Sequence, residues 1–170
     1  MKFNGLIHRL PKEIKLLIGA FSIVLSIGFY TGLLFVNETS SVSATGIEEN
    51  YIGNEDVEDA KVMKFKKSDK EMLSIVHSHI LSMGLIFFLV GLILSITDLS
   101  RPLKFFLMIE PFFSVVLTFG GIYLLWKGIL WMKYVVMFSG ALMTLSFTIA
   151  ILIILFQLIR SNNSTEGSVK

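Results

Sequence analysis

The chain has 170 residues, of which 54% are hydrophobic and 16% are charged, a balance too apolar for a soluble domain of this size. The formal net charge is only +2, and no basic patch is interleaved with aromatic residues, which excludes nucleic acid as a partner. The absence of cysteine excludes disulfides, thiolate metal sites and iron–sulfur clusters, so any cofactor would need histidine ligands.

The hydropathy of the chain predicts four membrane-spanning helices. Residues 1–15 read as a cytoplasmic amphipathic N-terminus with His8 and Arg9 on its wet side. Crossing a hydrocarbon core takes about 20 apolar residues, and four stretches meet that length. We place these stretches at residues 16–36, 68–97, 103–126 and 134–159, and we expect residues 160–170 to form a disordered cytoplasmic tail.

The connections predict how the helices are arranged. Short links join the second helix to the third and the third to the fourth, so consecutive helices must be antiparallel. The predicted fold is therefore an all-α membrane protein, an up-down-up-down bundle of four transmembrane helices. Residues 37–67, acidic and lysine-rich, form a small external segment between the first two helices, and a capping box at Ser68 and Glu71 starts the second. Basic residues near the ends predict that both termini are cytoplasmic.

Small and weakly polar residues line one face of each predicted helix, which indicates where the helices approach one another. Depth along the helices places Tyr30, His77, Gly121 and Gly140 in one layer near the external end. Two glycines opposite a phenol and an imidazole leave room for a ligand, so Tyr30 and His77 are candidate cofactor-binding residues. The alternative is that these two side chains bond each other or a serine. In that case the glycines serve close helix packing, as we also expect for Gly84, Gly91, Gly121 and Gly140.

His79 is a further candidate cofactor ligand. Residues two apart on a helix point about 200° from each other, so His77 and His79 cannot chelate one ion from a regular helix. A divalent metal held by His79 with Glu48 or Glu49 of the external segment is conceivable. A b-type haem would need a dimer or a tyrosine ligand, because the predicted helices contain only these two histidines.

Glu110 is a candidate proton- or ion-binding residue near the middle of the third helix. No lysine or arginine lies at its depth, so the neutral carboxyl is favoured unless water or a cation reaches it. Pro111 follows directly, frees a backbone carbonyl and is expected to bend the helix, which suits a gating or proton-handling position. The alternative is a neutral carboxyl hydrogen-bonded to serines.

Two motifs carry a resemblance that spans the chain from the first helix to the fourth. One is G-I-x-E-x-Y-x-G-N at residues 46–54, and the other is H-x-H at residues 77–79, near the start of the second helix. With them the chain resembles a loose group of uncharacterised small bacterial four-helix integral membrane proteins. The resemblance implies a bacterial inner-membrane location and an outer face where the loop motif and the histidines meet. It implies no biochemical activity.

Three functions fit these observations. The first is a non-catalytic accessory or assembly subunit that contacts the lipid bilayer and either another membrane protein or further copies of itself. The second is a module that binds haem b or a divalent metal through His77 and His79, with electron transfer as one use of such a module. The third is a proton- or ion-coupled carrier centred on Glu110. The chain has no nucleophile motif and no phosphate-binding loop, so an enzyme is disfavoured.

Overall fold

The computed structural model describes residues 4–55 and 62–166, and within these residues every regular element is helical. In chain order they are η1 (Leu6–Arg9), α1 (Lys12–Ser40), α2 (Ala44–Ile52), α3 (Asp69–Ser95), α4 (Arg101–Trp126) and α5 (Met132–Glu166). Four of the helices are long and apolar enough to cross a membrane: α1, α3, α4 and the Met132–Arg160 part of α5. The predicted all-α class with four such helices is confirmed.

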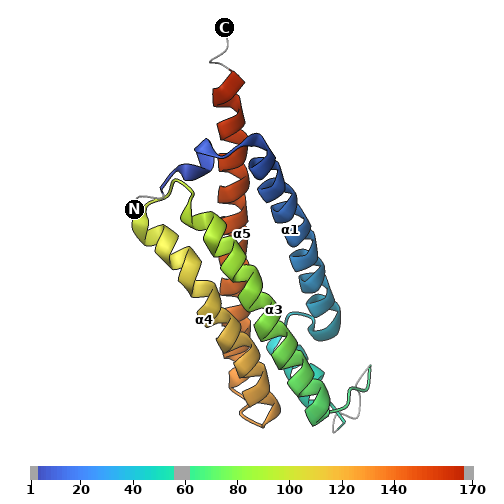
Figure 1. The fold of residues 1–170 in the computed structure, drawn as a ribbon. Coiled ribbons are helices and arrows are strands. Elements are labelled where there is room, and N and C mark those ends of the chain that lie inside the picture. Colours follow the sequence, from blue (N-terminus) through green and yellow to red (C-terminus); the bar gives the residue numbers. More distant parts are fainter. Residues whose placement is uncertain (1–3, 56–61, 167–170) are drawn as a thin grey trace.

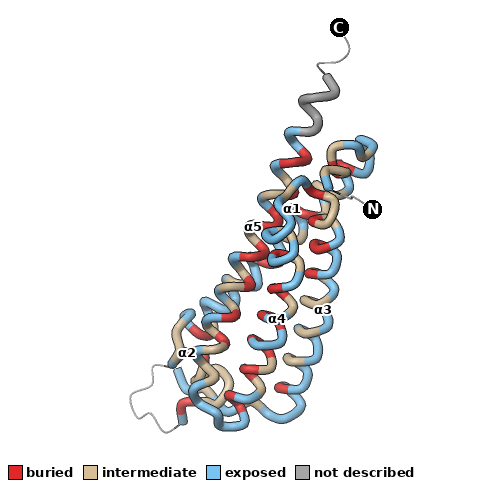
Figure 2. Tube along the Cα trace, turned by 90° about the vertical axis from the view of Figure 1, so that its left-hand side faces the viewer, coloured by how far each residue is buried: buried red, intermediate tan, exposed pale blue. Residues whose placement is uncertain are grey.

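The long helices alternate in direction along a common axis (Figure 1). Both chain termini lie at one end of the bundle, called here the terminal end, and α2 lies at the other, called the α2 end (Figure 2). The turns at Ile96–Ser100 and Lys127–Trp131 are short, so α3, α4 and α5 must pack as antiparallel neighbours. The up-down-up-down order follows from these connections.

The core of the bundle lies between α3, α4 and α5, and α1 is peripheral. In its most apolar stretch α1 is only 11% buried, against 50% for α4 and 44% for α5. The contacts of α1 are mainly with α2 and α5, and buried positions recur along α4 and α5 in Figure 2. We expected each helix, α1 included, to have one face turned toward the other helices. Lipid tails are as apolar as leucine, so hydrophobicity alone does not force a helix into the core.

The start of α3 forms the predicted capping box. The Ser68 hydroxyl accepts a hydrogen bond from the Glu71 amide at 3.3 Å, and the Glu71 carboxylate accepts one from the Ser68 amide at 2.8 Å. Two amides that the helix itself leaves without acceptors are satisfied in this way. The sequence therefore located this helix boundary correctly.

The N-terminal segment is docked on the bundle rather than lying apart from it. Gly5 and Ile7 donate backbone hydrogen bonds to the turn between α3 and α4, at the carbonyls of Thr97 (3.3 Å) and Ile96 (3.1 Å). The side chain of Ile7 is completely buried. Residues 1–3 of the predicted amphipathic N-terminus lie outside the described residues, as do residues 167–170 of the predicted tail; α5 continues as helix to Glu166.

Candidate functional site

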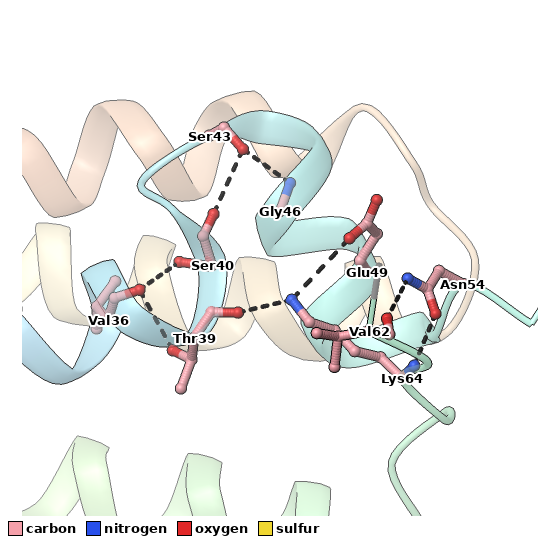
Figure 3. Close-up of polar contacts among 9 residues, drawn as sticks. All are labelled: Val36, Thr39, Ser40, Ser43, Gly46, Glu49, Asn54, Val62 and Lys64. Atoms are coloured by element: carbon pink, nitrogen blue, oxygen red, sulfur yellow. Dashed lines mark hydrogen bonds and ion pairs between the residues drawn. The ribbon is translucent and has the colours of Figure 1, made fainter. Parts of the chain in front are cut away.

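Residues 41–55 and 62–67, part of the segment predicted to be external, fold over the end of α1 as a compact cap around α2 (Figure 3). The hydroxyl of Ser43 accepts a hydrogen bond from the Gly46 amide at 2.9 Å, which caps the N-terminus of α2. Only glycine fits at position 46, because a Cβ there would lie 1.8 Å from the carbonyl oxygen of Ser40. The first glycine of the loop motif therefore allows α2 to turn back closely against α1.

The second half of the loop motif contacts the residues that lead into α3. Asn54 is buried; its amide donates to the carbonyl of Val62 at 3.0 Å, and its carbonyl accepts from the Lys64 amide at 2.7 Å (Figure 3). Gly53 has a φ of 96°, and a Cβ there would lie 2.8 Å from the amide nitrogen of Lys66. These contacts join the end of α2 to the residues that precede α3.

Two acidic residues of the cap, both on α2, form ion pairs with lysines. Glu48 pairs with Lys133 at the start of α5, and Glu49 lies 4.0 Å from Lys64. The ammonium group of Lys64 also donates to the carbonyl of Thr39 at 2.8 Å, at the C-terminus of α1 (Figure 3). Both carboxylates thus have lysine partners that join the cap to α1 and α5.

Tyr51 is partly buried within the cap. Burial raises the pKa of its phenol above the ordinary value of 10.0, and a hydrogen bond with Asn50 opposes that shift. The neutral phenol is therefore the form that the folded cap accommodates. Gly46, Gly53 and Asn54 of the loop motif thus shape the cap, and Tyr51 is partly buried within it.

The predicted metal site is not assembled. His79 is exposed, its Nδ1 lies 2.8 Å from the carbonyl oxygen of Ile75, and its ring stacks on Phe119 of α4 at 4.7 Å. Glu48 and Glu49 are held by lysines instead. Among the described residues, no group of three or more histidine or acidic side chains could hold a metal ion.

The predicted layer of Tyr30 and His77 requires correction. The hydroxyl of Tyr30 lies 2.7 Å from that of Thr148 on α5, and its ring makes edge contacts with Phe29 and Phe147. His77 lies on an exposed side of α3 rather than on an inward face. The physical reason is the placement of α1, which packs against α5 and so leaves that side of α3 uncovered.

The four glycines predicted to serve helix packing differ in their surroundings. A Cβ at Gly121 would lie 3.0 Å from Val136 of α5, and one at Gly91 would lie 4.0 Å from Met108 of α4. Around Gly84 and Gly140 nothing lies within 4 Å of such an atom. Two of the glycines therefore face a neighbouring helix at short range, and two face open space.

Glu110 is a buried polar residue inside the bundle. Its side chain is 8% exposed, the hydroxyl of Ser114 donates to its Oε1, and its Oε2 is buried without a hydrogen-bond partner among the described residues. Further along α4, Thr118 and Ser139 of α5 join their buried hydroxyls at 2.7 Å. Sequence reasoning located the carboxyl and its serine but missed the bond from α4 to α5.

Comparison with known proteins agrees with an architecture of membrane-spanning helices. A family model described as a transmembrane helical domain matches residues 41–165. The chain belongs to this family. The match takes in the cap and α3, α4 and nearly all of α5, and it begins after α1. No curated protein and no solved structure matches the chain. The protein is an integral membrane protein whose long helices contact the lipid bilayer.

Sequence reasoning overlooked the residues that join the cap to the helices. Lys64 and Lys133 reach across the structure to Thr39, Glu49 and Glu48, yet in the sequence they are two of many lysines near the membrane. The loop motif was visible as a pattern, but its partners were not. A signal existed in residues 37–67, where seven acidic residues are followed by four lysines. That pattern indicates pairing without identifying the pairs.

Proposed function

We propose that the protein is a non-catalytic accessory or assembly subunit, and that its α1 binds a helix of another membrane protein. The observation that carries this proposal is the exposed pair Gly28 and Gly32 on α1. Nothing lies within 4 Å of a Cβ built at either residue. Glycines four residues apart on an apolar helix allow a second helix to approach closely, as in the G-x-x-x-G type of transmembrane contact.

The rest of α1 is built to present this face. At the terminal end the ammonium group of Lys15 donates to the carbonyl of His8 in the docked N-terminal segment. At the α2 end Lys64 holds the last turn through Thr39, and midway Tyr30 bonds Thr148. In the middle of the helix Phe29 and Tyr30 contact α5, whereas Gly28 and Gly32 are exposed.

The composition of the exposed face favours a protein occupant over lipid. Each glycine in a helix interior costs about 1 kcal/mol relative to alanine, and lipid gives no compensation for that cost. A partner helix does, because its backbone and side chains can fill the shallow groove that two glycines leave. A second copy of the chain would satisfy the same geometry, so homo-oligomerisation is an outcome of the test below.

The test is retention of a partner in mild detergent. We expect the tagged protein to co-purify with a membrane protein. The double variant Gly28→Leu/Gly32→Leu should retain about tenfold less of that partner than the wild type, equivalent to about 1.4 kcal/mol of binding free energy. Gly84→Leu on α3 is the matched control, because that glycine also faces open space in a long helix. Equal recovery of the partner by the double variant and the wild type would contradict the proposal.

Binding of haem b or a divalent metal is the second candidate. It is supported by the exposure of both His77 and His79, since exposed imidazoles on a helix can share a ligand with a second chain. A visible absorption spectrum and elemental analysis of the purified protein test it. A Soret band or stoichiometric metal that disappears in the double variant His77→Ala/His79→Ala would support this function, and a colourless, metal-free protein would remove it.

A further inference from the structure

The free oxygen of Glu110 is a buried polar atom that the protein's own residues do not satisfy. Ser114 donates to Oε1, but Oε2 has no partner among the described residues, and the side chain is 8% exposed. A buried acceptor or donor left unpaired costs about 1–3 kcal/mol, and more if it is charged. Such a group in a membrane helix is retained where it binds something.

The surroundings of Glu110 select the ligand. No aspartate, glutamate, lysine, arginine or histidine occurs in residues 16–37 of α1, 80–95 of α3 or 134–159 of α5. The titratable side chains in those stretches are Tyr30 and Tyr134. Besides Glu110, α4 carries Tyr123 toward the α2 end and Arg101 and Lys104 at its start, at the terminal end. A metal cation needs several oxygen ligands and charge compensation, and one carboxyl cannot supply them. A proton, delivered by water, needs only the carboxyl.

The buried polar groups lead from Glu110 toward one end of the bundle. Ser114 and Thr118 follow at intervals of four residues on the same face of α4, covering about 12 Å. Ser114 is 2% exposed, Thr118 is 7% exposed, and Thr118 is bonded to Ser139, which is 1% exposed. This hydroxyl column, made of Ser114, Thr118 and Ser139, runs from the carboxyl toward the α2 end.

The buried residues that follow Glu110 most closely toward the terminal end are apolar, and the buried polar residues Thr97 and Gln157 lie farther along in that direction. Leu107 lies one turn before Glu110 on α4 and is 3% exposed, and Leu94 of α3 and Ile154 of α5 are completely buried. Hydroxyl groups and bound water can pass a proton between them, whereas packed aliphatic side chains exclude water. The hydroxyl groups of Ser114, Thr118 and Ser139 therefore favour the α2 side as the route for proton exchange.

We propose that Glu110 is a proton-binding site inside the membrane that exchanges its proton with the α2 end through the hydroxyl column. This role is separate from the docking proposed for α1, because α4 lies in the core and α1 at its edge. Loading places a proton on the carboxyl, with Oε2 hydrogen-bonded to a water molecule. Release returns the proton along Thr118 and Ser139.

Carbodiimide labelling tests the proton-loaded state. The O–H of a protonated carboxyl adds across one N=C bond of a carbodiimide, and rearrangement to the N-acylurea leaves the whole reagent attached. We expect the lipid-soluble dicyclohexylcarbodiimide to add its full mass to the peptide containing Glu110 in protein reconstituted in vesicles. Glu110→Gln should abolish this addition. Absence of the label on Glu110 at neutral pH would overturn the proposal.

Hydrogen exchange followed by infrared spectroscopy tests the route. The carboxyl C=O band, assigned by its loss in Glu110→Gln, shifts when the acid proton is replaced by deuterium. We expect Thr118→Val, which keeps the side-chain shape but removes the hydroxyl, to slow that shift about tenfold. Thr144→Val is the matched control, because the Thr144 hydroxyl bonds only its own helix at Gly140. Equal exchange rates for Thr118→Val and wild type would overturn the proposed route through the hydroxyl column. Circular dichroism of each variant verifies that the helices are intact.

Discussion

Gly46 shows how a single hydrogen atom in place of a side chain decides the path of the chain. The carbonyl group of Ser40 ends α1 and occupies the space that a Cβ at position 46 would need. Because that neighbour is backbone rather than the tip of a flexible side chain, it cannot move aside without shifting the end of α1 relative to α2. The glycine of the loop motif is thus a steric requirement of the cap.

A methyl group at this position should therefore destabilise the protein. We expect Gly46→Ala to lower the free energy of unfolding by about 1–3 kcal/mol, the usual cost of overpacking a tight site. Thermal unfolding of the detergent-solubilised protein measures the effect. Gly84→Ala is the control, since open space surrounds that glycine and alanine favours the helix. An unchanged melting temperature for Gly46→Ala would show that the cap can open at this point.

At the scale of elements, α1 differs from the other long helices in what holds it. The helices α3, α4 and α5 share an extensive core, whereas α1 depends on a few polar contacts near its ends and on Phe29 and Tyr30 in its middle. The ring of Phe29 stacks on Phe147 with centroids 4.0 Å apart. An element held in this way can loosen without unfolding of the whole bundle.

Removal of the Lys64 ammonium group should release the α2 end of α1. We expect Lys64→Gln to accelerate backbone amide exchange in the last turn of α1 and in α2, because the carbonyl of Thr39 and the carboxylate of Glu49 lose their shared donor. Hydrogen–deuterium exchange with mass spectrometry measures this change. Exchange in α4 should stay the same, and Lys70→Gln, at an exposed position of α3, provides the matched control. Acceleration confined to α4 would contradict this assignment.

At the scale of the whole molecule, the bundle has two chemically different ends. The terminal end holds a polar network in which Lys104 donates to Asn4 and to the carbonyl of Thr97, both at 2.6 Å. Gln157 of α5 donates to the carbonyl of Asp98 at 2.9 Å and so ties the α3–α4 turn to α5. The other end carries the cap. These two ends must meet different aqueous compartments if the four long helices span the bilayer.

The absence of cysteine makes this arrangement easy to test. We expect Ser41→Cys at the α2 end and Ser100→Cys at the terminal end, both at exposed positions, to react with a membrane-impermeant maleimide from opposite sides of sealed vesicles. The excess of basic residues near the termini predicts that Ser100→Cys faces the cytoplasm. Labelling of both positions from the same side would refute the four-span topology.

The sequence by itself determined the class, the four long helices, their alternation, the start of α3 at Ser68 and the burial of Glu110. These properties follow from composition, helix periodicity and capping chemistry, all of which act within one segment or between neighbours in the chain. Tertiary structure alone decided that α1 lies against α5, that Tyr30 meets Thr148 rather than His77, and that Lys64 and Lys133 bind the acidic residues of the cap. In a membrane, lipid solvates every apolar helix face about equally well. Which faces meet is therefore decided by shape and by sparse polar contacts between distant segments, and no local pattern encodes those.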